Sequence, residues 1–213
     1  MMVLLYAGVA LTSFLVGAVP FAWIIGKVGL GIDLRRVGSG NPGATNLYRT
    51  AGLAWGVPAL LLDAAKGWLP AFLAARLFPE AAAIGVMAGG AAIAGHIWTP
   101  FLNFRGGKGV ATAAGVFLGL NPLLLGVGLA VFLLVTAVSR YVSLGSLAGT
   151  FAAFLASFGL PLALGRPIDP YFVGFCGVCA AAIIFAHRKN ISRLIAGTEG
   201  RIGKSRPKNG KPI

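Results

Sequence analysis

Residues 110–138 read VATAAGVFLGL-NP-LLLGVGLAVFLLVTAV, an apolar run that is interrupted at Asn121-Pro122. As one helix the run would be about 43 Å long at ~1.5 Å per residue, well beyond the ~30 Å hydrocarbon core of a bilayer. A single crossing would also put Lys108 and Arg140 on opposite sides. Because an X-Pro step favours a break, the run predicts two short helices, 110–120 and 123–138, that form a hairpin.

The other apolar runs lie close to the ~20 residues that cross a bilayer. They occupy residues 3–26, 53–76, 82–98, 143–163 and 171–187. Together with the hairpin they predict an all-α integral membrane protein of seven transmembrane helices, some of them short. Residues 1–200 are expected to form a single transmembrane domain. Residues 201–213 are expected to form a basic cytoplasmic tail whose glycine, proline and lysine content favours disorder.

The distribution of charge predicts the orientation. The chain carries 18 Lys and Arg against 5 Asp and Glu. If seven crossings begin with the N-terminus outside, most of the basic residues fall in cytoplasmic loops, as the positive-inside rule requires. We therefore expect a cytoplasmic C-terminus. Membrane lipid headgroups account for the basic excess without nucleic acid, because the charges lie in short loops beside apolar runs and not in a separate basic domain.

The loop between the first two predicted spans is unusually polar. It reads GSGNPGATNLYR over residues 38–49. Glycine frees backbone N–H groups, and these combine with hydroxyl, carboxamide and guanidinium donors that suit a phosphate. The candidate phosphate or substrate ligands are Ser39, Gly40, Asn41, Thr45, Asn46 and Arg49. A flexible interfacial loop is the alternative, since Gly, Asn, Pro and Ser are common turn residues.

A second polar loop, residues 95–109, leads directly into the apolar segment that begins at Val110. A helix N-terminus after glycines offers unpaired N–H groups and a partial positive charge. The candidate phosphate ligands here are Gly106, Gly107, Lys108, Gly109 and Thr112. This is not a nucleotide P-loop, because Leu102 stands where the first glycine of that motif belongs and Gly109 where Ser or Thr belongs. A basic positive-inside loop is the alternative.

The third polar cluster, residues 187–199, follows the last predicted span. His187 and Asn190 share a face if the helix continues, and the histidine could be a general acid or base, or donate to a phosphate. Arg188 adds a cation, and Ser143, from the loop after residue 138, adds a hydroxyl. The alternatives are an interfacial histidine and an arginine that anchors the chain at the membrane surface.

Two other pairs of residues stand out within the spans. Asp63 and Lys66 are three apart in the second span and can form an ion pair, for which a structural and a functional role are both open. Cys176 and Cys179 lie in the last span, with His187 about 12 Å further along the helix axis. We interpret the cysteines as apolar packing residues, and no metal site or cofactor is expected.

Taken together, the three polar segments resemble the bacterial acyl-phosphate:glycerol-3-phosphate acyltransferase family. The matching residues are SGNPGATN (39–46), GH (95–96) with FRGGKGVAT (104–112), and HRKNISRL (187–194) with GTE (197–199). The likeness covers nearly the whole chain before Arg201. Arg105 stands where lysine is common in the family, which keeps the charge.

The resemblance implies seven spans in the bacterial cytoplasmic (inner) membrane and an active site that faces the cytoplasm. It also implies transfer of a fatty acyl group from acyl phosphate to the sn-1 hydroxyl of glycerol 3-phosphate, which yields lysophosphatidic acid and phosphate. This is the first acylation step of phospholipid biosynthesis. Whether a soluble enzyme that produces acyl phosphate docks on the basic face is left open.

We expect the polar residues to have different roles in binding and catalysis. Lys108, the 106–109 backbone and Ser39 would bind phosphate and stabilise the departing phosphate. His187 and Asn190 would orient or polarise the acceptor hydroxyl. The residues expected to position the polar groups of the substrates are Asn41, Thr45, Asn46, Arg49 and Ser143.

Three alternatives remain at this point. A transporter for phosphate esters fits the small residues and cations, although its polar groups should lie near the membrane midplane. An acyltransferase could use a thioester donor, but the His-x4-Asp pair of soluble-domain glycerolipid acyltransferases is absent, since Phe101 and Ser192 stand five residues after the two histidines. A structural protein of the lipid surface fits the organised loops least well.

Overall fold

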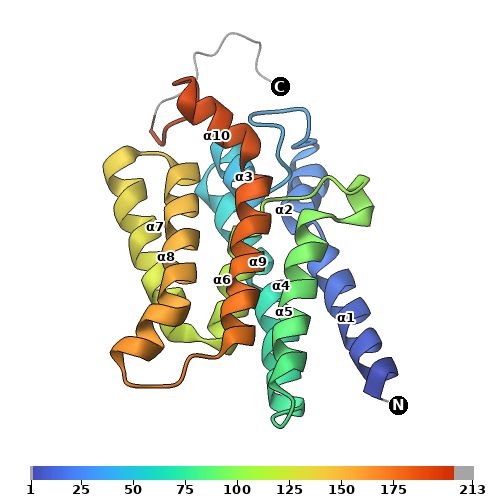
Figure 1. The fold of residues 1–213 in the computed structure, drawn as a ribbon. Helices are drawn as coiled ribbons and strands as arrows, with labels where there is room; N and C mark the ends of the chain where they lie inside the picture. The colour runs from blue at the N-terminus through green and yellow to red at the C-terminus, as the bar shows by residue number, and fades with distance from the viewer. Residues whose placement is uncertain (1, 204–213) are drawn as a thin grey trace, which may run out of the picture.

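The computed structural model describes residues 2–203, and these form one bundle of helices (Figure 1). Most of the predicted basic tail, residues 201–213, lies outside the described residues. The α-helices are α1 (Met2–Ala18), α2 (Phe21–Ile24), α3 (Ala44–Ala51), α4 (Leu53–Leu77), α5 (Ala82–Ile97), α6 (Val110–Leu120), α7 (Pro122–Ser139), α8 (Val142–Ala163), α9 (Pro170–Ala186) and α10 (Arg188–Ile195). A π-helical turn, Ile25–Gly29, follows α2, and a 3-10 turn, Pro100–Leu102, follows α5.

Within residues 2–203, five helical segments are long and apolar enough to cross a membrane. They are Met2–Gly29, Leu53–Leu77, Ala82–Leu102, Pro122–Ser139 and Val142–Ala163. The pair α9 and α10 would be a sixth, bent by 58° at the break between them. The protein is therefore an integral membrane protein. Seven crossings remain a prediction, because α6 has only 11 residues and rises about 16 Å, roughly half of the hydrocarbon core.

The predicted break at Asn121-Pro122 is confirmed. Helix α6 ends at Leu120 and α7 begins at Pro122. The side chain of Asn121 caps α7 by accepting a hydrogen bond from the backbone N–H of Leu124 at 3.1 Å. Proline fits at the first position of a helix, where no partner for its missing N–H exists. The two helices run in opposite directions, so the hairpin returns the chain to the end of the bundle from which it came (Figure 1).

Glycines hold α6 tightly against α4. A Cβ added to Gly67 of α4 would overlap the carbonyl oxygen of Thr112, and one added to Gly115 of α6 would overlap the carbonyl oxygen of Ala64. Small residues of this kind let two helix backbones approach closely in a membrane. The short helix α6, with Lys108 just before it, therefore has a defined position relative to α4.

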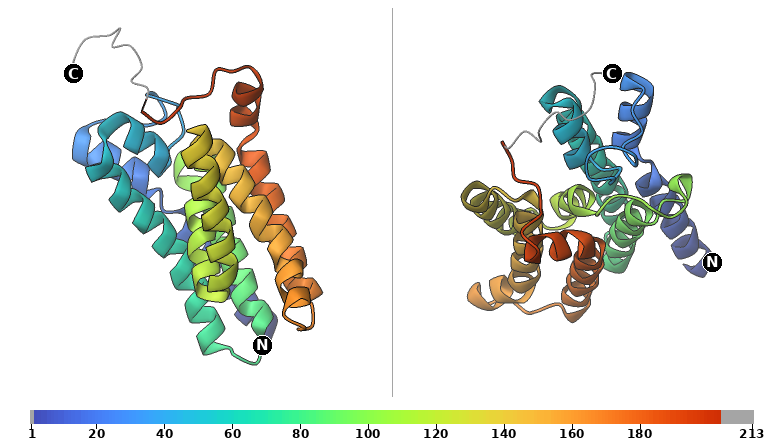
Figure 2. Two further views of the ribbon diagram at one scale, coloured as in Figure 1. Left: turned by 90° about the vertical axis from the view of Figure 1, so that its left-hand side faces the viewer. Right: turned by 90° about the horizontal axis from the view of Figure 1, so that it is seen from above.

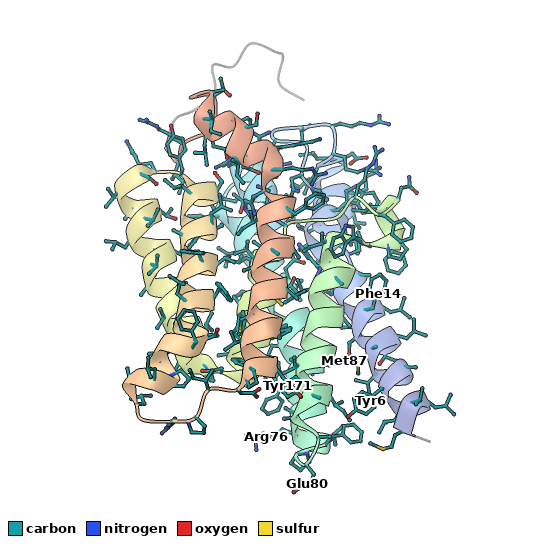
Figure 3. The ribbon with its side chains drawn as sticks, in the orientation of Figure 1. Tyr6, Phe14, Arg76, Glu80, Met87 and Tyr171 are labelled. Carbon is teal, nitrogen blue, oxygen red and sulfur yellow. The ribbon has the colours of Figure 1, made fainter. Side chains whose placement is uncertain are left out.

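The polar segments gather at one end of the bundle. Figure 1 shows α3, α10 and the loop after α2 at the end opposite the N-terminus. Seen from above in Figure 2, the segment that follows α10 lies across the helix ends. Arg76, Glu80 and Tyr171 are at the other end, as Figure 3 shows. The three clusters singled out in the sequence thus meet in space, although they lie far apart along the chain.

Candidate functional site

A cavity of about 360 Å³ opens among the helices beneath the polar loops. Its lining comes from helices α3 to α10 and from the loops between them. Away from the polar loops the wall is apolar and includes Phe117, Leu124, Leu129, Phe154, Cys176 and Ile183. The cavity therefore joins a polar end to an apolar body, and its shape suits an amphipathic ligand with a charged head and a hydrocarbon chain.

Most of the predicted site residues line this cavity. They are Ser39, Asn41, Thr45, Asn46, Arg49, Lys108, Gly109, Ser143, His187 and Asn190. The predicted residues outside its lining are Gly40, Gly106, Gly107, Thr112 and Arg188. The guanidinium of Arg188 instead lies 4.4 Å from the ring centroid of Phe185 and donates to the Phe185 carbonyl. Arg188 is exposed at the surface and outside the cavity lining, so its predicted role as a substrate ligand gains no support from this geometry.

The expected role of Gly106 and Gly107 as phosphate donors is corrected by their hydrogen bonds. The N–H of Gly106 donates to the Ile97 carbonyl at 3.0 Å, and that of Gly107 to the His96 carbonyl at 3.1 Å. A Cβ on either glycine would overlap atoms of His96, so their small size is needed to pack this turn against α5. Thr112 is fully buried and is packed against Gly67 of α4.

Free N–H donors come instead from two helix N-termini. Gly109 takes a left-handed conformation (φ 83°) and starts α6, while Gly43 starts α3. The first-turn residues Val110 and Ala111 of α6, like Ala44 and Thr45 of α3, line the cavity. First-turn N–H groups have no partner within their own helix and carry the positive end of the helix dipole. Two helix N-termini therefore contribute positive potential to the cavity, as anion binding requires.

Asn46 organises the first polar loop from within. Its Oδ1 accepts from the Ser39 N–H at 2.8 Å, and its Nδ2 donates to the carbonyls of Leu34 and Val37 at 3.0 and 3.1 Å. Both polar atoms of the Asn46 side chain, which is only 2% exposed, are therefore engaged in hydrogen bonds within the loop. Asn46 therefore shapes the loop and keeps Ser39, whose side chain is exposed, at the cavity, while its predicted contact with a substrate stays a prediction.

Glu199, which was not among the predicted site residues, joins three polar side chains at the cavity. Its Oε1 accepts from Ser143 Oγ at 2.9 Å and from Asn190 Nδ2 at 2.7 Å, and its Oε2 accepts from Arg193 Nε at 2.7 Å. The residue is 6% exposed and lines the cavity. It links α8, α10 and the segment after α10. One acidic residue within a strongly basic segment was the signal that could have found it.

His187 lies at the break between α9 and α10, where the chain bends by 58°. It is 1% exposed, and its Nδ1 is 2.8 Å from the Ile183 carbonyl oxygen. A carbonyl can only accept, so Nδ1 carries a proton and donates it. In the neutral ring this leaves Nε2 as an acceptor for a hydroxyl of a ligand.

The electrostatic surroundings of Lys108 alter its acid–base behaviour. Burial lowers the pKa of Lys108 from its ordinary 10.5 to about 8, while the nearby Glu199 raises it and Arg193 and Arg49 lower it. Burial also raises the pKa of Glu199, but hydrogen bonds from Arg193, Asn190 and Ser143 outweigh this and keep its pKa below the ordinary value. At neutral pH the polar end thus holds one ionised carboxylate among several cations.

These charges predict an alkaline limb in the pH profile of any reaction that needs an anion here. A phosphate monoester is already a dianion above its second pKa of about 6, so raising the pH through about 8 removes only the proton of Lys108. We expect kcat/KM for a phosphorylated substrate to fall above that pH. The Lys108→Arg variant should lack the limb, because arginine stays protonated. A parent profile that is flat to pH 10 would contradict this.

A buried ion pair lies beside the cavity. Lys66 Nζ is 2.8 Å from Asp63 Oδ1 and donates to the Val19 carbonyl at 2.6 Å. Both side chains are at most 4% exposed, so the predicted pairing is confirmed. Cys176 and Cys179 are free and buried, as packing residues are expected to be. Among residues 2–203, no group of three or more His, Cys, Asp or Glu side chains is placed to hold a metal ion.

The fold and the cavity define an integral membrane protein with a cationic, donor-rich cavity at one end of a helix bundle. The chain belongs to the glycerol-3-phosphate acyltransferase family, whose model matches residues 7–197. It is therefore an acyltransferase, and the resemblance inferred from the three polar segments is confirmed.

Individual relatives agree with this assignment. The glycerol-3-phosphate acyltransferase of Trichlorobacter lovleyi is 47% identical over 190 residues, which cover 89% of this chain and 93% of that protein. The enzyme of Aquifex aeolicus is 40% identical over 189 residues, which cover 89% and 95%.

Solved structures of a related protein share the fold. The glycerol 3-phosphate form of PlsY, an integral membrane glycerol 3-phosphate acyltransferase, matches with a TM-score of 0.85 and 38% identity, over 93% of this chain and 96% of that one. The lysophosphatidic acid form of PlsY matches with a TM-score of 0.82 and 36% identity, over 93% and 95%.

Proposed function

We propose that this protein transfers a fatty acyl group from acyl phosphate to the sn-1 hydroxyl of glycerol 3-phosphate. The products are 1-acylglycerol 3-phosphate (lysophosphatidic acid) and inorganic phosphate, and the reaction is the first acylation step of phospholipid biosynthesis. Family membership and the substrate and product forms of PlsY support acylation of glycerol 3-phosphate. The observation that carries the proposal is the single cavity that joins a cationic, donor-rich end to an apolar body.

Both substrates carry a phosphate, and the polar end offers two sets of donors for them. Lys108 and the N-terminus of α6 form one set, and Arg49 with the N-terminus of α3 forms the other. Charge-assisted hydrogen bonds of this kind are the strong ones. The acyl chain would lie in the apolar body, between α6, α7, α8 and α9, with its activated carbonyl near the polar end.

The chemistry needs no covalent enzyme intermediate. The acceptor hydroxyl oxygen attacks the carbonyl carbon of the acyl phosphate and forms the new ester bond. The bond between that carbon and the phosphate oxygen breaks, the phosphate leaves with the electron pair, and the hydroxyl proton ends on the released phosphate. His187 Nε2 would accept the hydrogen bond of the attacking hydroxyl and orient it. Lys108 and the α6 N-terminus would stabilise the charge on the leaving phosphate.

The proposal places the site on the cytoplasmic side of the bacterial inner membrane. Seven crossings, with the N-terminus outside, would put the end that bears α3 and α10 in the cytoplasm. The concentration of Lys and Arg in the loops at that end supports this orientation through the positive-inside rule. Residues 1–200 would act as one domain. That same basic end offers a surface on which a soluble enzyme that produces acyl phosphate could dock.

The donor can be tested with purified protein in detergent, labelled glycerol 3-phosphate and one of three palmitoyl donors. We expect lysophosphatidic acid with palmitoyl phosphate, together with one phosphate released per product, and none with palmitoyl-CoA or a palmitoyl thioester of acyl carrier protein. Product from a thioester would keep the acyltransferase but overturn the proposed donor. A folded sample that gives no product with any donor would overturn the proposed reaction.

A further inference from the structure

Asp63, Lys66 and His96 form a buried polar cluster that the proposed chemistry does not use. Their exposed fractions are 2%, 4% and 8%. Besides the ion pair of Asp63 with Lys66, His96 Nδ1 lies 3.7 Å from Asp63 Oδ1. Removing two charges from water is costly. An ion pair that is buried inside a membrane helix is therefore expected to be there for a specific reason. The surroundings of the cluster supply one.

The cluster connects the junction between α1 and α2, inside the first span, to the loop that carries Lys108. On one side, Lys66 donates to the Val19 carbonyl, at the junction between α1 and α2. On the other side, Gly107 packs against His96, because its N–H donates to the His96 carbonyl and a Cβ there would overlap His96 Nε2. The next residue in the chain is Lys108.

The cluster also lies between the two polar loops. A small cavity of about 10 Å³ is lined by all three of its side chains, by Pro42 of the first loop and by Gly106-Gly107 of the second. Asp63 and His96 line the main cavity as well. One buried group of side chains thus shares a small cavity with residues of both polar loops.

We propose that Asp63, Lys66 and His96 are positioning residues, which hold the Gly106-Gly107 turn and so fix Lys108 at the polar end of the cavity. The inference rests on the role of Lys108 in the proposed function. The ion pair with Lys66 fixes the position of the Asp63 carboxylate, which lies 3.7 Å from His96 Nδ1. The imidazole of His96 in turn packs against Gly107 of the turn. None of the three side chains needs to touch a substrate.

Two variants test this network. His96→Asn keeps a polar atom near the position of Nδ1, which faces Asp63, and removes the Nε2 edge that meets Gly107. Asp63→Asn combined with Lys66→Gln removes both charges together, so that neither is left buried and unpaired. The matched control is Ser157→Ala, a buried hydroxyl of α8 that donates to the Phe154 carbonyl, away from both loops.

The readouts are the melting temperature, the KM for palmitoyl phosphate and the pH profile of kcat/KM for the same donor. Both test variants should raise KM about tenfold or more, the effect expected when a charge-assisted contact is misplaced. They should also move the alkaline limb from about pH 8 towards the ordinary lysine pKa of 10.5, because a displaced Lys108 regains contact with solvent. Ser157→Ala should leave KM and the limb in place.

Several outcomes would overturn the inference. Folded variants that keep the KM and the limb of the parent protein would show that the cluster serves stability alone. A lower melting temperature without a shift of the limb would lead to the same conclusion. If the parent has no limb that depends on Lys108, the proposed role of Lys108 fails together with the inference. If the parent limb is present but unmoved in the variants, only the inference fails.

Discussion

Lys108→Ala is expected to lower kcat/KM for glycerol 3-phosphate by roughly 1,000-fold, the upper range for losing one preorganised donor to a developing anion. The half-buried ammonium lies at the polar end of the cavity, directly before the N-terminus of α6. Because Lys108 is half-buried, each of its electrostatic contacts counts for more than it would in solution. Steady-state kinetics with palmitoyl phosphate as donor measures this effect.

Two control variants show whether the effect of Lys108→Ala depends on the charge and position of this residue. Lys108→Arg keeps the charge but changes its position and geometry, so a smaller loss of about 10- to 100-fold is expected. Lys189→Ala removes an exposed cation of α10, outside the cavity, and should leave turnover within about twofold because surface charges are screened. Near-normal turnover of a folded Lys108→Ala protein would remove this residue from the mechanism.

Glu199→Ala should have the second largest effect, on both activity and stability. It would leave Arg193, Asn190 and Ser143 without their shared acceptor. Breaking a buried charged network from one side costs about 3–5 kcal/mol. We expect a melting temperature lower by several degrees and a kcat lower by about 100-fold, since misplaced catalytic groups carry a penalty of this size.

Glu80→Gln is the matched control for Glu199, because Glu80 is exposed at the opposite end of the bundle (Figure 3). It should change neither the melting temperature nor kcat. Glu199→Gln keeps the shape and one acceptor, so its stability should lie between those of the parent and of Glu199→Ala. Should Glu199→Ala retain the melting temperature and kcat of the parent, Glu199 would have no part in holding the site.

Local sequence features were enough to predict the helices from α4 to α9, but not the break after Ala18 in the first predicted span, nor helix α3 within the first polar loop. Apolar runs, interrupted by proline and glycine, gave the break at Asn121-Pro122, which α6 and α7 reproduce. Helix length was harder to interpret. Both halves of the hairpin were counted as crossings, but α6 rises only about half of the ~30 Å core. Its place in the bundle comes from backbone contact with α4 through Gly67 and Gly115, which no local pattern reveals.

The residues of the site could likewise be predicted from local sequence, but the role of each one could not. The three polar clusters could be recognised from the sequence because loops rich in hydrogen-bond donors are visible in its composition. They do meet at one cavity in the structure. What each donor does depends on contacts between residues far apart in the chain. The amides of Gly106 and Gly107 are used by the end of α5. Ser143 and Glu199 are 56 residues apart, so the carboxylate that organises Asn190 could not be found from spacing alone.

An experimental structure of the protein with glycerol 3-phosphate bound tests the central claim most directly. The account predicts the phosphate at the polar end of the cavity, between the N-termini of α3 and α6. At least one phosphate oxygen should lie within hydrogen-bond distance of the Arg49 guanidinium or of a first-turn N–H of α3, and the glycerol hydroxyls should be directed towards His187. A phosphate bound outside the cavity, against the exposed cations Arg188 and Lys189, would contradict the account.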